Sequence, residues 1–163
     1  MKSPPINERE FASLIQENSR IINKVCYFYA TDKMPFGDLR QEIYVNIWLG
    51  LSQFRGDSKI STWIYRVAVN SALMTIRSSK PRPDTVSLDF GLLDVSTEVD
   101  DAQRENLQTL QSLINRLEDI EKAIILLWLD EYTYDEITET LGMKRNTVAV
   151  KIHRIKEKLS KQI

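Results

Sequence analysis

The strongest constraint on the fold lies near the C-terminus, in YTYDEITETLGMKRNTVAVKIHRIKEKL, residues 132–159. Thr133 followed three residues later by Glu136 is a capping box, which predicts a helix over about 134–141. Gly142 is suited to the left-handed conformation that ends a helix and lets the chain turn at once. A second helix follows, and its apolar residues, at steps of four, three and four, form one buried stripe: Val148, Ile152, Ile155 and Leu159.

Positive charge gathers on the second of these two helices. Residues 144–163 hold seven lysines and arginines against one acid, whereas 103–143 hold three against nine. A short helix, a glycine turn and a basic second helix predict a helix-turn-helix whose second helix lies in the major groove of DNA. The alternative is a helical hairpin with a solvated charged face.

Angular position on the second helix sorts its residues by expected contact. Asn146, Ala149, Val150 and His153 lie opposite the buried stripe, with Arg145 and Arg154 close by, and are candidates for base edges. Lysines 144, 151 and 156 are candidates for phosphate contacts, and His153 is equally compatible with a plain surface position. The duplex-binding candidates are Lys144, Arg145, Asn146, Thr147, Ala149, Val150, Lys151, His153 and Arg154.

Helical spacing of apolar residues also runs through the first half of the chain. One amphipathic helix is expected to carry Phe11, Leu14, Ile15, Ile22 and Val25, and the next Leu39, Ile43, Ile47 and Leu51. A third is expected to open with Ser61 or Thr62 as its cap and to run to about Arg77, before KPRP at 80–83. No strand-like alternation is long enough to predict a sheet.

These patterns predict an all-α fold of two small helical domains joined by a flexible linker. The first domain is expected over 1–83 and the second over 102–163. Between them, residues 84–101 contain six acids, no base and no sustained apolar period, which is typical of a linker.

A second basic surface is predicted on the third helix. Residues 58–83 hold five lysines and arginines and no acid. Thr62, Arg66, Asn70, Leu73 and Arg77 form a polar, basic stripe beside a packed face that includes Ile64, Val67, Ser71 and Met74. Cations next to aromatic residues suit unpaired bases, so this surface is a candidate for single-stranded DNA. The alternative places Trp63 and Tyr65 in the core.

Other functional classes are excluded by what the chain lacks. Cys26 and the lone His153 cannot make a metal site, and no nucleophile, base and orienting residue are gathered together. We therefore expect no enzyme activity, no cofactor, no metal and no small-molecule substrate. Neither a membrane span nor a secretory signal is evident, so a cytoplasmic location is expected.

Together the two halves resemble the sigma-70 family of bacterial RNA polymerase sigma factors, in the extracytoplasmic-function (ECF) group. Residues 38–77 resemble sigma region 2 and residues 134–159 resemble region 4. The resemblance implies a protein that binds the largest-subunit clamp and the flap of core RNA polymerase, recognises the −35 promoter element with the second domain and opens the −10 element with the first. It also implies an anti-sigma partner, often membrane-anchored.

The resemblance assigns roles to residues of the first half. The polymerase-binding positions are Asp38, Gln41, Glu42, Tyr44 and Trp48. The −10 recognition and opening positions are Phe54, Arg55, Lys59, Ser61, Thr62, Trp63, Arg66, Asn70 and Arg77.

The chain also departs from the family pattern. Lys144 stands where the family often has a serine cap, and Ala149 and Val150 where it often has a basic and a small polar residue. These departures imply a distinct promoter preference. Two alternative functional hypotheses stay open: a free-standing helix-turn-helix regulator that binds duplex DNA without polymerase, and an adaptor that binds only proteins.

Overall fold

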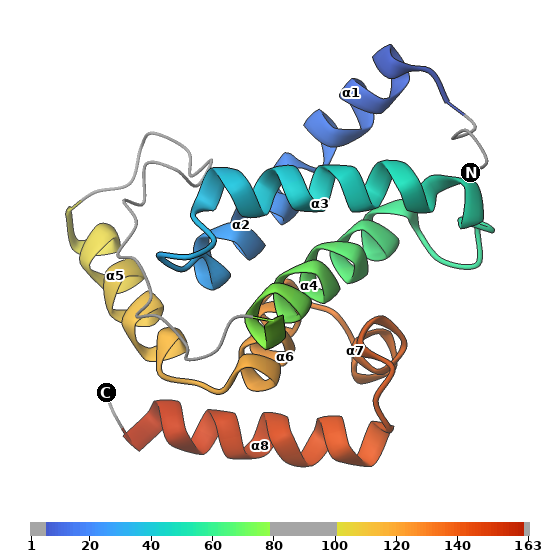
Figure 1. The fold of residues 1–163 in the computed structure, drawn as a ribbon. Helices are drawn as coiled ribbons and strands as arrows, with labels where there is room; N and C mark the ends of the chain where they lie inside the picture. The colour runs from blue at the N-terminus through green and yellow to red at the C-terminus, as the bar shows by residue number, and fades with distance from the viewer. Residues whose placement is uncertain (1–5, 79–100, 162–163) are drawn as a thin grey trace. The chain divides into compact units, whose positions relative to one another are not determined.

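The computed structural model describes residues 6–78 and 101–161, and all regular structure in these ranges is helical (Figure 1). The chain divides into two compact units, residues 1–95 and 96–163. The expected all-α, two-domain fold is therefore confirmed. Apart from Asp101, the expected linker 84–101 lies outside the described residues, and the predicted limits of the two domains stay predictions.

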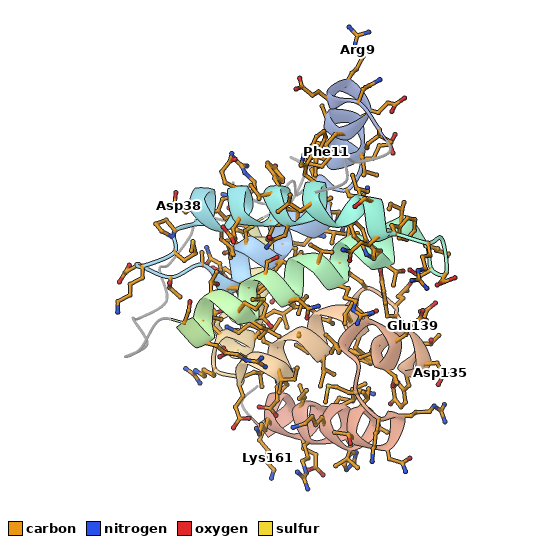
Figure 2. All side chains as sticks on the ribbon, turned by 45° about the vertical axis from the view of Figure 1, so that its right-hand side comes forward. Arg9, Phe11, Asp38, Asp135, Glu139 and Lys161 are labelled. Carbon is orange, nitrogen blue, oxygen red and sulfur yellow. The ribbon has the colours of Figure 1, made fainter. Side chains whose placement is uncertain are left out.

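Unit 1 is built around three packed helices with a fourth at its side. Its elements are α1 (Glu8–Glu17), α2 (Ser19–Tyr29), α3 (Phe36–Gly50), the 3₁₀ turn η1 (Leu51–Gln53) and α4 (Ile60–Ser78). Helices α2, α3 and α4 pack on one another, and the apolar stripe Leu39, Ile43 and Ile47 of α3 is fully buried between them. Helix α1 buries no residue completely, and its Phe11 packs edge-on against Trp48, with ring centroids 4.9 Å apart (Figure 2).

The first predicted helix is in fact two helices, because the chain breaks at Asn18. This residue has φ −113° and ψ 14°, and its side-chain amide donates to the carbonyl oxygen of Leu14 at 2.9 Å. A side chain that hydrogen-bonds the preceding turn competes with continuation of the helix. The expectation of one amphipathic helix through Val25 was therefore wrong, although Ile22 and Val25 are buried as expected.

Helix α4 begins earlier than its sequence indicates. The amide of Trp63 donates to the carbonyl oxygen of Lys59 at 3.1 Å, so the first helical residue is Ile60. Ser61 and Thr62 lie inside the first turn, and the prediction that either caps the helix was wrong. Angular position on the helix predicts that Met74 lies on the packed face. This prediction was wrong, because the Met74 side chain is 67% exposed.

In unit 2, residues 101–161 form four helices, three of which pack against the most apolar one. Its elements are α5 (Asp101–Asn115), α6 (Asp119–Leu129), α7 (Tyr134–Leu141) and α8 (Arg145–Lys161). Residues 121–127 of α6 are all buried, and α6 packs on each of the other three.

The helix-turn-helix prediction is confirmed in its local detail. The Thr133–Glu136 capping box is formed in both directions, at 3.1 and 2.8 Å. Gly142 is left-handed at φ 67°, and α8 begins three residues later, at Arg145. Of the predicted stripe, Val148, Ile152 and Ile155 are fully buried and Leu159 is half-buried.

Candidate nucleic-acid interfaces

One face of α8 is available to a partner molecule along most of its length. We call this the duplex face, and define it by the nine candidate residues predicted from sequence. Seven of them are exposed and two, Ala149 and Lys151, are half-buried; the exposed residues are Lys144, Arg145, Asn146, Thr147, Val150, His153 and Arg154. The stripe buried against α6 and α7 orients this face toward solvent.

The beginning of α8 presents positive charge from both backbone and side chains. The carbonyl of Lys144 accepts from the amide of Val148 at 3.1 Å, so Lys144 occupies the position where a side-chain cap would stand. The first turn of α8 contains no acid. Free backbone amides, the helix dipole and two cations therefore favour an anion such as a DNA phosphate at this end.

Several basic groups in the described part of unit 2 are engaged within the protein. Arg145 Nε pairs with Asp135 Oδ1 at 2.9 Å, and His153 Nε2 lies 3.2 Å from Glu157 Oε1 one turn away. Lys156 Nζ lies 4.3 Å from the ring centroid of Trp128, and Lys158 Nζ contacts both carboxylate oxygens of Glu121. Lys156 stays a predicted phosphate contact, because its side chain is exposed. It also has an aromatic partner within the protein, whereas Lys158 has an acidic one.

A second set of polar residues is exposed on unit 1. We call it the strand face, and define it by the nine −10 candidates predicted from sequence. Arg55, Lys59, Arg66, Asn70 and Arg77 are exposed, and Phe54, Ser61, Thr62 and Trp63 are half-buried. The charged groups of the basic stripe on α4 therefore face solvent.

The two aromatic residues of the strand face pack on each other and on the end of α3. The rings of Phe54 and Trp63 are 5.4 Å apart, centroid to centroid, at a tilt of 49°. A methyl group on Gly50 would lie 3.0 Å from the ring of Trp63, so this ring rests directly on the α3 backbone. Tyr65 is fully buried, in agreement with the core alternative, whereas Trp63 both anchors the loop and stays partly accessible.

A shallow groove of about 450 Å³ runs between α3 and α4. Glu42 and Asn46 of α3 face Val67, Asn70 and Met74 of α4 across it. At its base the Asn46 amide donates to Ser71 Oγ at 2.8 Å, which ties the two helices together. The groove therefore joins the strand face to the outer surface of α3.

The outer surface of α3 differs in composition from the sequence prediction. Asp38, Gln41 and Glu42 are exposed, but Tyr44 and Trp48 are half-buried, and burial raises the pKa of the Tyr44 hydroxyl. Sequence reasoning missed Val45 and Leu49, which are 50% and 46% exposed. Their spacing from Asp38 and Glu42, on the side of the helix opposite the buried stripe, is the signal that would have found them.

The described residues offer neither a metal site nor a membrane-spanning helix. Within residues 6–78 and 101–161 no three histidine, cysteine or acidic side chains come together as metal ligands. In the same ranges no helix is both long enough and apolar enough to cross a bilayer. Cys26 is fully buried, and burial raises the pKa of its thiol to about 12, which leaves it unreactive as a nucleophile.

Comparison with known families assigns both units. Residues 14–82 match the family described as Sigma-70 region 2, and residues 107–159 match Sigma-70, region 4. The strand face and the outer surface of α3 lie within the first match, and the duplex face lies within the second.

Individual relatives match along nearly the whole chain. The ECF RNA polymerase sigma factor SigW of Bacillus subtilis is 30% identical, covering 94% of this chain and 88% of that protein. The ECF RNA polymerase sigma-E factor of Haemophilus influenzae is 30% identical over 89% of this chain and 84% of that protein.

Two solved structures share the fold. One is CnrH in complex with the cytosolic domain of CnrY, with 20% identity, a TM-score of 0.66, and coverage of 96% of this chain and 88% of that one. The other is the sigma factor RpoE of Bartonella quintana in complex with the anti-sigma factor NepR, with 14% identity, a TM-score of 0.72, and coverage of 94% and 96%.

Proposed function

Because the chain belongs to the ECF group of the sigma-70 family and is an RNA polymerase sigma factor, we propose that its two basic faces divide the work of promoter recognition between them. The observation that carries this proposal is that both faces are exposed on separate units. Arg66 and Asn70 are exposed on α4, and the side of α8 opposite its buried stripe is exposed as well. Had either been buried in its own unit, no DNA contact could be assigned to it.

The duplex face is proposed to bind the −35 element as paired DNA. Helix α8 is amphipathic. One stripe is buried in the core of unit 2, and the opposite side, which can meet DNA, carries cations and small residues. Its early residues suit base edges, since the N-terminal part of a recognition helix enters the major groove. Val150 and Ala149 are proposed to contact thymine methyl groups, and Lys144 and Lys151 phosphates.

The strand face is proposed to hold the −10 element after the strands separate. Trp63 and Phe54 offer partly accessible aromatic surface beside Arg55, Lys59 and Arg66. An unpaired base that stacks on such a surface gains about 1–3 kcal/mol, which offsets much of the cost of unpairing it.

The outer surface of α3 is proposed to bind the clamp of core polymerase. Asp38, Gln41 and Glu42 form a polar rim around the exposed apolar residues Val45 and Leu49. An apolar centre within a polar rim is the usual composition of a protein interface. Trp48 is proposed to contribute through its packing with Phe11, which supports this surface from the side.

Regulation by an anti-sigma factor is proposed by analogy with the RpoE structure, whose partner is an anti-sigma factor. A protein that works with core polymerase acts in the cytoplasm, and we propose that location for this chain.

The proposal is tested by run-off transcription with purified bacterial core polymerase and a promoter library randomised at both elements. The expected result is transcripts that depend on adding this protein, with enriched −35 and −10 sequences. The intact protein alone is expected to bind duplex DNA weakly in a gel shift. Tight binding without polymerase would favour the free-standing regulator, and failure to bind core polymerase would contradict the proposal.

A further inference from the structure

The ion pair between Arg145 and Asp135 joins the two helices of the helix-turn-helix at its solvent-facing side. Arg145 is the first residue of α8, and Asp135 lies in the first turn of α7. The Nε to Oδ1 distance is 2.9 Å, and the side chains are 66% and 79% exposed. Figure 2 shows Asp135 projecting outward from α7, near Glu139 on the same helix. Both side chains are therefore accessible to a macromolecule that docks on the duplex face.

The ion pair engages Arg145 at the Nε side of its guanidinium. Nε lies 2.9 Å from Asp135 Oδ1, and a guanidinium carries five N–H donors in all, more than one carboxylate can accept. A carboxylate held against Nε limits rotation of the guanidinium, whose two terminal nitrogens can make a bidentate contact of their own. Guanine offers O6 and N7 as a matching pair of acceptors in the major groove.

We propose that Asp135 is a positioning residue that orients Arg145 to read a guanine in the −35 element. This inference rests on the proposed role of the duplex face and deepens it, because it names the base and the side chain that makes the contact selective. In water an exposed ion pair contributes little. Docking of DNA removes water from around the pair, so the attraction between the two side chains is stronger in the complex than in the free protein. The guanidinium is thus held in one orientation when it meets the base.

A simple electrostatic role for Asp135 predicts a different outcome. An acidic side chain beside DNA repels phosphates, so its removal would strengthen binding to all sequences alike. Glu139 provides the matched control, since it is an exposed acid on the same helix. Removing Glu139 changes the charge of α7 by the same amount without touching the Arg145 pair.

The experiment measures the −35 preference of holoenzyme reconstituted from bacterial core polymerase and the full chain, on a promoter library randomised at that element. The variants are D135A, D135N, E139A, R145A and the double variant D135A/R145A. R145A is expected to lower the preference for guanine at one position on the order of tenfold. D135A is expected to lower it at the same position by about two- to fivefold, leaving the other positions unchanged. D135N, whose amide oxygen can accept a hydrogen bond from the guanidinium but carries no charge, is expected to retain part of the preference.

The controls separate this inference from the proposed function. E139A is expected to keep the wild-type preference, and D135A/R145A to match R145A alone, because Asp135 acts only through Arg145. Urea unfolding of each variant checks that the helix-turn-helix remains folded. If D135A behaves like E139A, or if R145A weakens all sequences equally, the inference is overturned while the proposed function stands. If wild-type holoenzyme gives no promoter-dependent transcripts, both are overturned.

Discussion

The carboxylate of Glu121 accepts hydrogen bonds from the ammonium group of Lys158 at 3.1 and 3.0 Å, which ties the beginning of α6 to the end of α8. The same carboxylate accepts from the amide of Glu118 at 3.2 Å, as one half of the capping box of α6. Its side chain is only 6% exposed, whereas that of Lys158 is 51% exposed. One buried acid thus both starts a helix and fixes the recognition helix to the core of unit 2.

Replacing Glu121 with alanine is therefore expected to destabilise unit 2 by about 2 kcal/mol, since a cap and a charge-assisted contact are lost together. Lys158→Met keeps the cap and is expected to cost less, about 1 kcal/mol, because its side chain is more exposed. Urea unfolding followed by circular dichroism measures both. Equal stability of wild type and the alanine variant would mean that this contact does not anchor α8.

Two residues in the left-handed conformation flank α7, Glu131 before it and Gly142 after it. Adding a Cβ at the glycine and removing the side chain at the glutamate are expected to change stability in opposite directions. Gly142→Ala is expected to cost about 1 kcal/mol, because its φ of 67° disfavours any Cβ even though nothing lies within 4 Å of one. Glu131 has φ 65°, so Glu131→Gly is expected to stabilise by a similar amount. Gly37→Ala, at a helical glycine with open space around it, is the control and should be neutral or mildly stabilising. Thermal unfolding of the three variants distinguishes conformational strain from packing.

Lys24 makes the stability of unit 1 depend on pH. Burial, and next the nearby Arg20, lower the pKa of its ammonium group from 10.5 to about 7, and its Nζ lies 5.0 Å from the centroid of the Tyr65 ring. Between pH 7 and 10.5 the unfolded chain binds a proton that the folded chain does not, so this group makes stability rise with pH across that window. Below pH 7 the folded protein carries the full cost of a buried charge.

The substitution Lys24→Met is expected to remove this dependence. It should stabilise unit 1 by about 1–3 kcal/mol at pH 6 and by much less at pH 9. Urea unfolding midpoints of the wild type and the variant at pH 6 and pH 9 measure the difference in stability between the two proteins. Titrating groups that both proteins share cancel in this difference. A difference that is the same at pH 6 and pH 9 would show that Lys24 keeps its charge in the folded state.

Two lysines of α8 are expected to differ in their contribution to DNA binding. Lys151→Ala should reduce the slope of log affinity against log salt by about 0.9, as expected for the loss of one phosphate contact. Lys156→Ala should reduce it by less, because its ammonium group already lies 4.3 Å from the centroid of the Trp128 ring. Holoenzyme binding to a −35 duplex over a range of salt concentrations measures both slopes. Equal slopes for the two variants would mean that Lys156 contributes a full phosphate contact despite its position over the Trp128 ring.

How much of the site was predictable depends on the kind of residue. The exposed basic residues of α8 and α4 were found from helical periodicity and charge, because both are local properties of the chain. Val45 and Leu49 were missed, since an apolar residue on a predicted helix is assigned to the core by default. The packing of α3 on α2 and α4 leaves both side chains outside, on the side of the helix that their spacing from Asp38 and Glu42 indicates.

The sequence by itself determined the helix-turn-helix, because a capping box, a left-handed glycine and a four-three-four apolar stripe act within one or two turns of backbone. Tertiary structure alone decided which cations are paired within the protein: Lys158 contacts Glu121, Lys156 the ring of Trp128, and Arg145 Asp135. These partners lie on other helices, and their distances depend on how the helices pack. Periodicity along one helix contains no information about that packing, which is why charge could be counted from the sequence but its use could not.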